Sequence, residues 1–215
     1  MSQRDLNKIM DRIYKKMPEE KIPWVLDKVP DLLKDLIETD KIKPCKAIDL
    51  GCGLGIYAIY LAKSGFDVTG VDISPESIKI AREKARRDGV NCNFIVADVL
   101  GDIDKKIDTT FDLAYDWELL HHIFPEDRDR YVKNVYKLLN PGGKYISVCF
   151  NEDDQAFGSP KKYRKTKIGT ILYFSSEDEL KRLFWRYFRI LEIKKIKING
   201  KFGDRIVNYA FMERR

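Results

Sequence analysis

The sequence predicts an α/β fold: a doubly wound, mostly parallel sheet with helices on both faces. Three observations lead to this prediction. Short segments rich in β-branched residues alternate with helical segments between residues 47 and 150, as in parallel strands joined by crossover helices. The first of these strands runs directly into a turn with three glycines. Near the C-terminus two apolar segments flank a turn, so an antiparallel hairpin is expected at one edge of the sheet.

A length of 215 residues favours one domain, 1–215, in three parts. Residues 1–44 are expected to form an N-terminal cap of helices, residues 45–150 the core, and residues 151–215 a loop followed by a helix and a hairpin. In the cap, apolar residues recur at helical spacing over 2–17 and again over 25–39. Pro30 lies within the second stretch and is expected to break or restart that helix.

Strands and helices alternate through the core. Ser74 is a good N-cap before Pro75 at the first helical position, and Asp88-Gly89 is expected to end that helix. Residues 102–110 are polar and charged and are expected to form a loop, and residues 141–143 a turn. The predicted strands are 47–50, 66–72, 93–98, 111–116 and 144–150, and the predicted helices are 56–63, 75–87 and 126–139.

The region after the core begins with a long loop, 151–170, which holds a cluster of basic residues. Ser176 and Glu179 then form a capping box, which predicts a helix directly after it. Residues 190–198 and 206–212 are the two predicted hairpin strands, and they bring the predicted sheet to seven strands. The segment between them is expected to be a loop of more than two residues.

Composition excludes several classes of protein. Hydrophobic residues make up 44% of the chain, but no segment approaches the ~18 apolar residues of a membrane span, and the N-terminus lacks a signal region. We therefore expect a cytoplasmic protein with no membrane partner. The four cysteines lack metal-site spacing, so we expect free thiols and no metal. The net charge is +6, but bases alternate with acids, so a nucleic-acid partner is not expected.

The glycine turn is the most informative motif. Gly51, Gly53 and Gly55 lie between the first strand and the first core helix, where a ligand can lie against bare backbone. Asp49 precedes them, and Asp72 ends the second strand about 20 positions after Gly51, the spacing of an acid that accepts hydrogen bonds from ribose hydroxyls. The motif therefore predicts a nucleotide-like cofactor.

Two cofactors compete for this motif. A dinucleotide pattern matches in the frame from Gly53 to Ala58, but that frame starts past the end of the strand and leaves Asp49 unexplained. A carboxylate beside a pyrophosphate is repulsive, whereas beside an ammonium or a sulfonium it is favourable. The charges therefore favour S-adenosylmethionine over a dinucleotide.

The chain resembles the class I S-adenosylmethionine-dependent methyltransferases. Four stretches match the ordered motifs of that family: 48–55, 71–74, 97–99, and 111–123 followed by 138–144. The resemblance implies a Rossmann-like fold whose last strands are antiparallel, with residues 45–150 as the cofactor-binding core and S-adenosylhomocysteine as a product. A faint likeness at Pro23-Trp24 suggests the branch that includes thiopurine, thiol and halide methyltransferases.

The resemblance also implies roles for individual residues. The methionine part of the cofactor would contact the glycine turn and the acid before it: Asp49, Gly51, Gly53 and Gly55. The nucleoside would contact Asp72 through the ribose, Ile73 and Asp98 through the adenine, and the Val99 N–H through a ring nitrogen. Asp116 and Trp117, where the fourth strand ends, would line the methyl-transfer end.

The acceptor side is less well specified. Methyl transfer needs alignment above all, and a thiolate or halide acceptor needs no general base, whereas a hydroxyl or ammonium acceptor does. Candidates for such a group follow the fourth strand: Tyr115, Asp116, Glu118, His121 and His122, of which Asp116 and His121 are the named catalytic candidates. The two histidines are adjacent, so at most one is expected to face the site. Tyr14, Trp24 and Arg164 are the candidate substrate-pocket residues, with Arg164 on a lid over residues 151–170.

These observations favour methylation of a small molecule. Methylation of RNA or protein is an alternative suggested by the positive charge. Enzymes that methylate the exocyclic amines of nucleic-acid bases usually carry a Pro-Pro element after the fourth strand, and here residues 116–119 read Asp-Trp-Glu-Leu instead. A cofactor-binding module without catalytic activity is a second alternative. The sequence does not indicate an oligomeric state.

Overall fold

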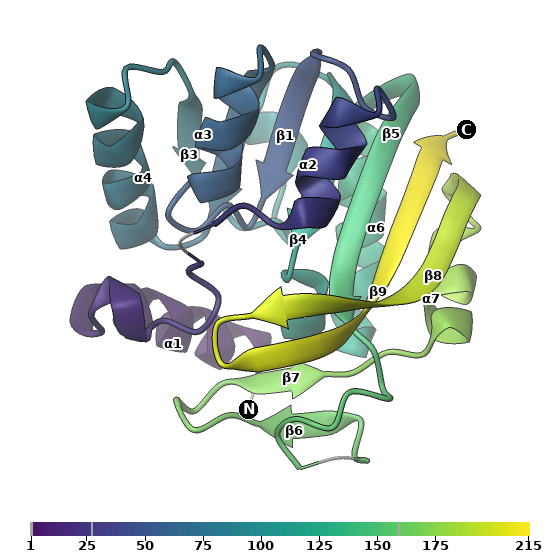
Figure 1. Ribbon diagram of the computed structural model, residues 1–215. Coiled ribbons are helices and arrows are strands. Elements are labelled where there is room, and N and C mark those ends of the chain that lie inside the picture. Colours follow the sequence, from purple (N-terminus) through teal and green to yellow (C-terminus); the bar gives the residue numbers. More distant parts are fainter. Residues whose placement is uncertain (1, 27, 159) are drawn as a thin grey trace.

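A computed structural model describes residues 2–26, 28–158 and 160–215. It contains one seven-stranded sheet in the order β3-β2-β1-β4-β5-β9-β8 and a separate hairpin, β6-β7 (Figure 1). This confirms the predicted α/β fold and the predicted strand count. The strands are β1 (Lys46–Leu50), β2 (Asp67–Asp72), β3 (Asn93–Val96), β4 (Phe111–Trp117), β5 (Leu139–Phe150), β6 (Tyr163–Lys165), β7 (Ile171–Tyr173), β8 (Phe188–Gly200) and β9 (Gly203–Arg214).

The first five strands in the order of the main sheet pair in parallel, and β9 runs antiparallel to them. β1 pairs with β2 on one side and β4 on the other, so the order of the strands reverses at β1. In open α/β sheets, ligands bind beyond the carboxyl ends of the strands at such a reversal. β9 pairs antiparallel with both β5 and β8, as the hairpin signal predicted.

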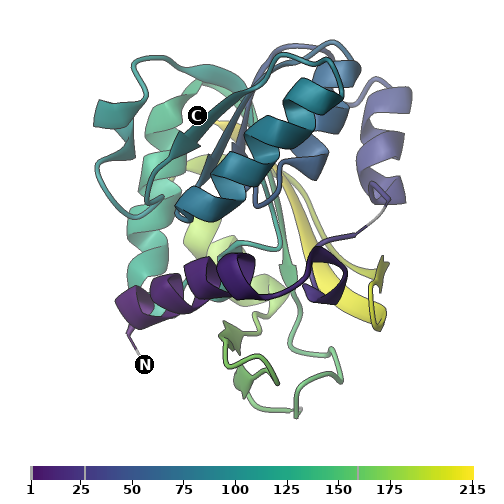
Figure 2. The same cartoon turned by 90° about the vertical axis from the view of Figure 1, so that its left-hand side faces the viewer.

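Helices cover both faces of the sheet. One apolar cluster joins the sheet to α2, α3 and α4, and a second joins the opposite face to α5, α6 and α7. The remaining helix, α1, crosses the end of the sheet where the parallel strands finish (Figures 1 and 2). The helices are α1 (Gln3–Lys16), η1 (Glu19–Lys21), α2 (Asp31–Glu38), α3 (Ile56–Lys63), α4 (Pro75–Arg87), α5 (Ile103–Lys106), η2 (Leu120–His122), α6 (Pro125–Leu138) and α7 (Glu177–Phe184).

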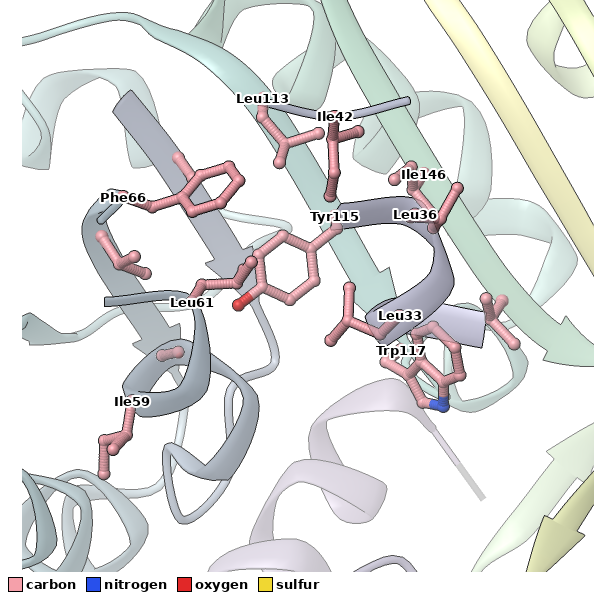
Figure 3. Packing of buried hydrophobic residues seen from close by; sticks show 14 of the residues in the cluster. Leu33, Leu36, Ile42, Ile59, Leu61, Phe66, Leu113, Tyr115, Trp117 and Ile146 are labelled. Carbon is pink, nitrogen blue, oxygen red and sulfur yellow. The ribbon is translucent and has the colours of Figure 1, made fainter. Parts of the chain in front are cut away.

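The alternation of side chains along β4 determines what can reach the site. Leu113, Tyr115 and Trp117 belong to the cluster beneath α2 and α3 (Figure 3). Ala114 and Asp116, at the intervening positions, face α6, as the pleat of a strand requires. Asp116 and Trp117 therefore point to opposite faces of the sheet although they are neighbours in sequence.

Helices with strong local signals match their predicted limits. α3 and α4 begin and end where the sequence places them, and Ser74 accepts a hydrogen bond from the Ser77 N–H at the start of α4. α7 begins with the predicted capping box, in which Ser176 and Glu179 each accept a hydrogen bond from the other's backbone N–H.

Four predicted segments differ from the structure. The helix predicted over 25–39 covers only α2, because it begins after Pro30. The predicted loop 102–110 contains the short helix α5, whose Ile103 is buried. β5 begins before the predicted turn at 141–143, with an irregular register against β4. The C-terminal hairpin pairs as far as Gly200 and Gly203, so its turn has two residues rather than the longer loop expected.

Several absences hold for the residues that the structure describes. None of the helices in these ranges is long and apolar enough to cross a membrane. The four cysteines are free thiols. Within the same ranges, no three His, Cys, Asp or Glu side chains gather as they would around a metal ion.

Candidate functional site

The glycine turn after β1 adopts a conformation that other residues rarely adopt. Gly51, Gly53 and Gly55 have φ angles of +76°, +52° and +73°. A Cβ on Gly53 would lie 2.9 Å from the Tyr14 hydroxyl, and one on Gly51 would lie 2.9 Å from a methyl of Leu119. Both the backbone and the space therefore require glycine, and Tyr14 lies directly over the turn.

Asp72 joins this turn to the end of β2. Its carboxylate accepts hydrogen bonds from the N–H groups of Gly53 and Ser74, both at 2.9 Å. The parallel pairing of β1 with β2 brings the two loops together at the carboxyl ends of the strands. Burial is the main influence on the pKa of this carboxyl and raises it, while these hydrogen bonds oppose the rise.

Asp49 lies beneath the same turn and is only 2% exposed. Its Oδ2 has no hydrogen-bond partner among the described residues. Burial raises its pKa to about 8, with repulsion from Asp72 and Asp116 adding to the effect. A buried carboxyl with an unpaired oxygen is a suitable partner for a bound cation, which would favour its ionised form.

These residues line a cavity at the carboxyl ends of β1, β2 and β4, which we call the first cavity. It contains ten of the residues predicted from the sequence: Tyr14, Trp24, Asp49, Gly51, Gly53, Asp72, Ile73, Asp98, Val99 and Trp117. Gly55 lies outside it and begins α3, packed against Phe94. Residues named separately from the sequence thus lie around one cavity, and their roles stay predictions.

The N-terminal helix α1 closes one side of the first cavity. Asp11 accepts a hydrogen bond from the Ser74 hydroxyl at 2.7 Å, and Gln3 donates to the His122 carbonyl at 2.9 Å. These two contacts hold α1 against the segments that follow β2 and β4. Leu6, Met10 and Tyr14 of the same helix contribute to the wall of the cavity.

The far end of the first cavity is aromatic. Trp117 lines it, and its indole N–H is buried without a partner among the described residues. The ring of Tyr57 meets that of Trp117 edge-on at 5.8 Å. Trp24 donates its indole N–H to the Tyr14 hydroxyl at 2.8 Å, so these two side chains form one wall.

Asp116 lies apart from the cavity. It is fully buried on the α6 face, where it accepts hydrogen bonds from the hydroxyls of Tyr131 at 3.0 Å, Tyr145 at 2.5 Å and Ser147 at 3.2 Å. Burial raises its pKa to about 6, and the hydroxyls oppose that rise. The structure therefore gives Asp116 a place in the core, whereas the sequence analysis placed it beside Trp117 at the methyl-transfer end.

A second cavity, of about 370 Å³, adjoins the first. Its walls come from the N-terminal segment, the η2 region, the β6-β7 hairpin and the tip of β8-β9, which all lie at the same end of the sheet (Figure 1). Trp24, Glu118 and His122 line both cavities. The other lining residues include Phe150, Phe157, Ile168, Leu172, Lys201 and Arg205.

The two histidines form one continuous wall of the second cavity, since their ring centroids are only 4.6 Å apart. His121 stacks on Phe150 at 4.2 Å, and His122 meets Trp24 edge-on at 5.9 Å. Both histidines therefore line the second cavity, whereas only His122 lines the first, and the expectation that at most one faces the site stays a prediction. Burial lowers both pKa values, that of His122 to about 4, so both rings are neutral near pH 7.

Arg164 lies in the framework of the loop rather than in either cavity. Its guanidinium donates hydrogen bonds to the carbonyls of residues 152, 154, 156 and 161, and lies over the Phe174 ring at 3.8 Å. The side chain is 2% exposed. These contacts hold the backbone at residues 152, 154, 156 and 161 and bury the guanidinium away from both cavities.

Glu118 is the residue that the structure brings forward. It follows β4 with a φ of +65°, a backbone conformation that costs about 1–2 kcal/mol for a residue other than glycine. Burial raises its pKa to about 7, against an opposing effect of Arg205. The sequence analysis included Glu118 among the polar residues after the fourth strand but not among the named catalytic candidates. Trp24, the two histidines and the 151–170 segment, all named from the sequence, contribute to the second cavity, but no motif showed that they meet in one place.

Comparison with known proteins identifies the core. A family profile described as a methyltransferase domain matches residues 47–143. The match spans somewhat less than half of the chain. This match covers the strands and loops that build the first cavity. It agrees with the methyltransferase family that the sequence motifs predict.

Two curated relatives methylate small molecules, according to their names. A ubiquinone biosynthesis O-methyltransferase of Coxiella burnetii is 34% identical over 128 residues, 60% of this chain and 53% of the relative. A 2-heptyl-1-hydroxyquinolin-4(1H)-one methyltransferase of Mycobacteroides abscessus is 29% identical over 184 residues, 85% of this chain and 74% of the relative. The chain thus spans about half the length of the first of these relatives.

The fold also matches solved structures. One comes from work on the conversion of a disulfide bond into a thioacetal group during echinomycin biosynthesis, and it has a TM-score of 0.80. It is 22% identical, and the match covers 97% of this chain and 92% of the other. The likeness supports the Rossmann-like fold. The thiopurine, thiol and halide branch stays a prediction.

Proposed function

We propose that this protein transfers a methyl group from S-adenosylmethionine to a small molecule held in the second cavity. The observation that carries the proposal is the shared wall formed by Trp24, Glu118 and His122. It joins a cavity built on the methyltransferase motifs to a second, mostly apolar one. Two ligands bound in these cavities would meet at that wall.

The first cavity has groups suited to each part of the cofactor. Asp49, with its unpaired oxygen, suits the ammonium of the methionine part beside the bare backbone of Gly51 and Gly53. Asp72 suits the ribose hydroxyls, and Asp98 suits the adenine amino group, with Ile73 and Val99 beside it. When bound, the cofactor supplies a methyl group on a positively charged sulfur.

The protein's main contribution to the reaction would be alignment. The sulfonium is already activated, so holding the acceptor in line with the methyl group can supply much of the rate enhancement. Trp117 and Tyr57 would close the cavity around the sulfonium end and exclude water. Their faces are also favourable surroundings for a positively charged group.

The second cavity indicates the kind of acceptor. Its volume of about 370 Å³ suits a small molecule. Its walls include His121 stacked on Phe150 and the apolar side chains of Ile168 and Leu172, which favour a planar, largely apolar ring system. The names of the quinone and quinolone methyltransferases among the relatives agree with such an acceptor.

Binding and transfer can be tested separately. Calorimetry with S-adenosylhomocysteine should detect binding to the wild type, and Asp98→Ala should weaken it by about 10-fold or more through loss of a hydrogen bond to a charged group. Asp102→Ala is the control, because Asp102 is exposed outside the cavity. Labelled S-adenosylmethionine is then supplied with phenols, hydroxyquinolones, thiols, halides, amines and an RNA pool.

We expect transfer to one of the planar small molecules in this panel. Absence of cofactor binding would contradict the proposal at its base. Binding with transfer only to RNA would favour the alternative of a macromolecular acceptor, and binding with no transfer would favour a module without catalysis. A cytoplasmic location stays part of the proposal.

A further inference from the structure

We propose that Glu118 is the general base of this methyl transfer, so that the acceptor brings a protonated oxygen or nitrogen rather than a thiolate or halide. The inference rests on the proposed function. It decides between two acceptor classes that the sequence left open, because only a protonated nucleophile needs a base.

The position of Glu118 is the first support. It is one of three residues that line both cavities, so it lies where the acceptor and the methyl group would meet. Its N–H donates to the Val148 carbonyl at 2.8 Å, which anchors the backbone to β5 directly after β4 ends. The left-handed conformation at this point turns the chain from β4 toward η2.

The other two residues of the shared wall are less suited to take a proton. Trp24 is a donor only, and its indole N–H is already used by Tyr14. His122 is a neutral imidazole whose pKa is lowered to about 4, which makes it a weak base. Glu118 is therefore the stronger proton acceptor on this wall.

The surroundings of the Glu118 carboxylate are the second support. Among the described residues, no group donates a hydrogen bond to this carboxylate or forms an ion pair with it. The carboxylates of Asp72 and Asp116, in contrast, each accept hydrogen bonds. Burial raises the pKa of Glu118 to about 7, so about half of its carboxyl groups are ionised at neutral pH. A base with a pKa near the working pH can both be ionised and bind a proton well enough to assist catalysis. A carboxylate held for structure would instead be saturated with donors.

Backbone strain in the second cavity is the third support. Among the described residues, three other than glycine have positive φ, and two of these, Glu118 and Phe157, line the second cavity. The Arg205 guanidinium lies over the Phe157 ring at 5.4 Å and acts electrostatically on Glu118. Concentration of strain in one cavity is typical of a site that holds side chains for a task.

The reaction step then balances as follows. The O–H or N–H bond of the acceptor breaks, and the proton passes to a Glu118 carboxylate oxygen. The freed electron pair forms the new bond to the methyl carbon while the carbon–sulfur bond breaks. Its electron pair stays on sulfur, which gives neutral S-adenosylhomocysteine. Glu118 later releases the proton to water.

The test compares Glu118→Gln with wild type on one phenol and one thiol acceptor. With the phenol, kcat of the wild type should rise with pH toward a plateau, with an apparent pKa near 7. Glu118→Gln should lose about 100-fold or more at pH 7, the usual range for general base catalysis, and should regain rate as the phenol ionises in solution. Glu126→Gln makes the same chemical change at an exposed position outside both cavities and serves as the control.

A second variant guards against a folding defect. Glu118→Gly removes the carboxylate at a backbone conformation that glycine adopts freely, and added acetate should restore part of its rate. Calorimetry with S-adenosylhomocysteine should give a Kd within about threefold of wild type for both variants.

Full phenol activity in either Glu118 variant would overturn the proposal, as would a wild type that methylates only thiols or halides. Failure of the wild type to bind S-adenosylhomocysteine would instead contradict the proposed function itself. The two failures are therefore distinguishable.

Discussion

Substituting Gly53 by alanine tests how the glycine turn is built. The alanine would keep a φ near +52°, which costs about 1–2 kcal/mol for a residue with a Cβ. Its Cβ would lie 2.9 Å from the Tyr14 hydroxyl, too close for an unshifted contact. Because that hydroxyl is held by the Trp24 indole at 2.8 Å, moving it would cost a hydrogen bond of about 1 kcal/mol. We expect a loss of about 2–3 kcal/mol of unfolding free energy.

The two contributions can be separated with matched variants. Gly89 has a φ of +68°, and a Cβ added there would have nothing within 4 Å, so Gly89→Ala should report the backbone cost alone, about 1–2 kcal/mol. Tyr14→Phe removes the contacting hydroxyl. In Gly53→Ala/Tyr14→Phe the loss should be smaller than the sum of the single losses by about 1 kcal/mol.

Urea unfolding of the four variants and calorimetry with S-adenosylhomocysteine are the assays. The Gly53 variant should also bind the product more weakly, whereas Gly89→Ala should bind like wild type. Additive losses within about 0.5 kcal/mol would refute the contact between Tyr14 and the turn. Equal losses for Gly53→Ala and Gly89→Ala would lead to the same conclusion.

Three further variants probe buried groups. The Asp49 carboxyl has a pKa of about 8 when folded against an ordinary 3.8, so it holds its proton more tightly in the folded state, and wild-type stability should fall as pH rises from about 4 to about 8. Asp49→Asn should make the unfolding free energy, measured with urea, less dependent on pH between about 4 and 8, and it should weaken binding of S-adenosylmethionine. An unchanged dependence on pH would contradict the raised pKa of Asp49. Arg164→Ala leaves four backbone carbonyls without the hydrogen bonds that the guanidinium donates. It should lower the unfolding free energy by about 3 kcal/mol in thermal or urea unfolding, with S-adenosylhomocysteine affinity within twofold of wild type. Asp116→Asn disturbs three hydroxyl donors and should cost about 1–3 kcal/mol with no effect on cofactor affinity, and a specific loss of that affinity would restore Asp116 to the site.

Local signals account for the parts of the fold that were predicted best. The limits of α4 follow from Ser74, Pro75 and the Asp88-Gly89 end, which act within one turn of the helix. Segments decided by distant contacts were predicted less well. Ile103 makes α5 a helix only because it packs into the second apolar cluster, and the two-residue hairpin turn depends on pairing between β8 and β9.

The same distinction divides the site. Much of the first cavity is built from loops that directly follow β1, β2 and β3, so a short motif marks each of those walls, whereas α1 forms a wall without such a motif. Neighbouring strand positions alternate between faces, which would have separated Asp116 from Trp117 on the sequence alone. Arg164 could not be placed this way, because its direction depends on the path of the loop around it.

The second cavity has no continuous sequence signature. Its walls come from residues 21–26, 118–122, 150–172 and 200–205, which meet only through packing. Apolar and basic residues in these segments are also typical of ordinary surface loops. Glu118 was visible as a polar residue at the end of a strand, but its shared position between two cavities was not.

The contact made by Lys201 has a consequence for the order in which the protein assembles. Its ammonium group donates to the carbonyls of Glu19, Ile22 and Val25, which lie 176–182 positions earlier in the chain. The glycine turn and Asp72, by comparison, are 19 positions apart. Long-range closure is slow because the entropy of the intervening chain opposes it. During synthesis the contact between the glycine turn and Asp72 can therefore form while the ribosome is still extending the chain, whereas the second cavity closes only when the last hairpin reaches back to the N-terminal segment.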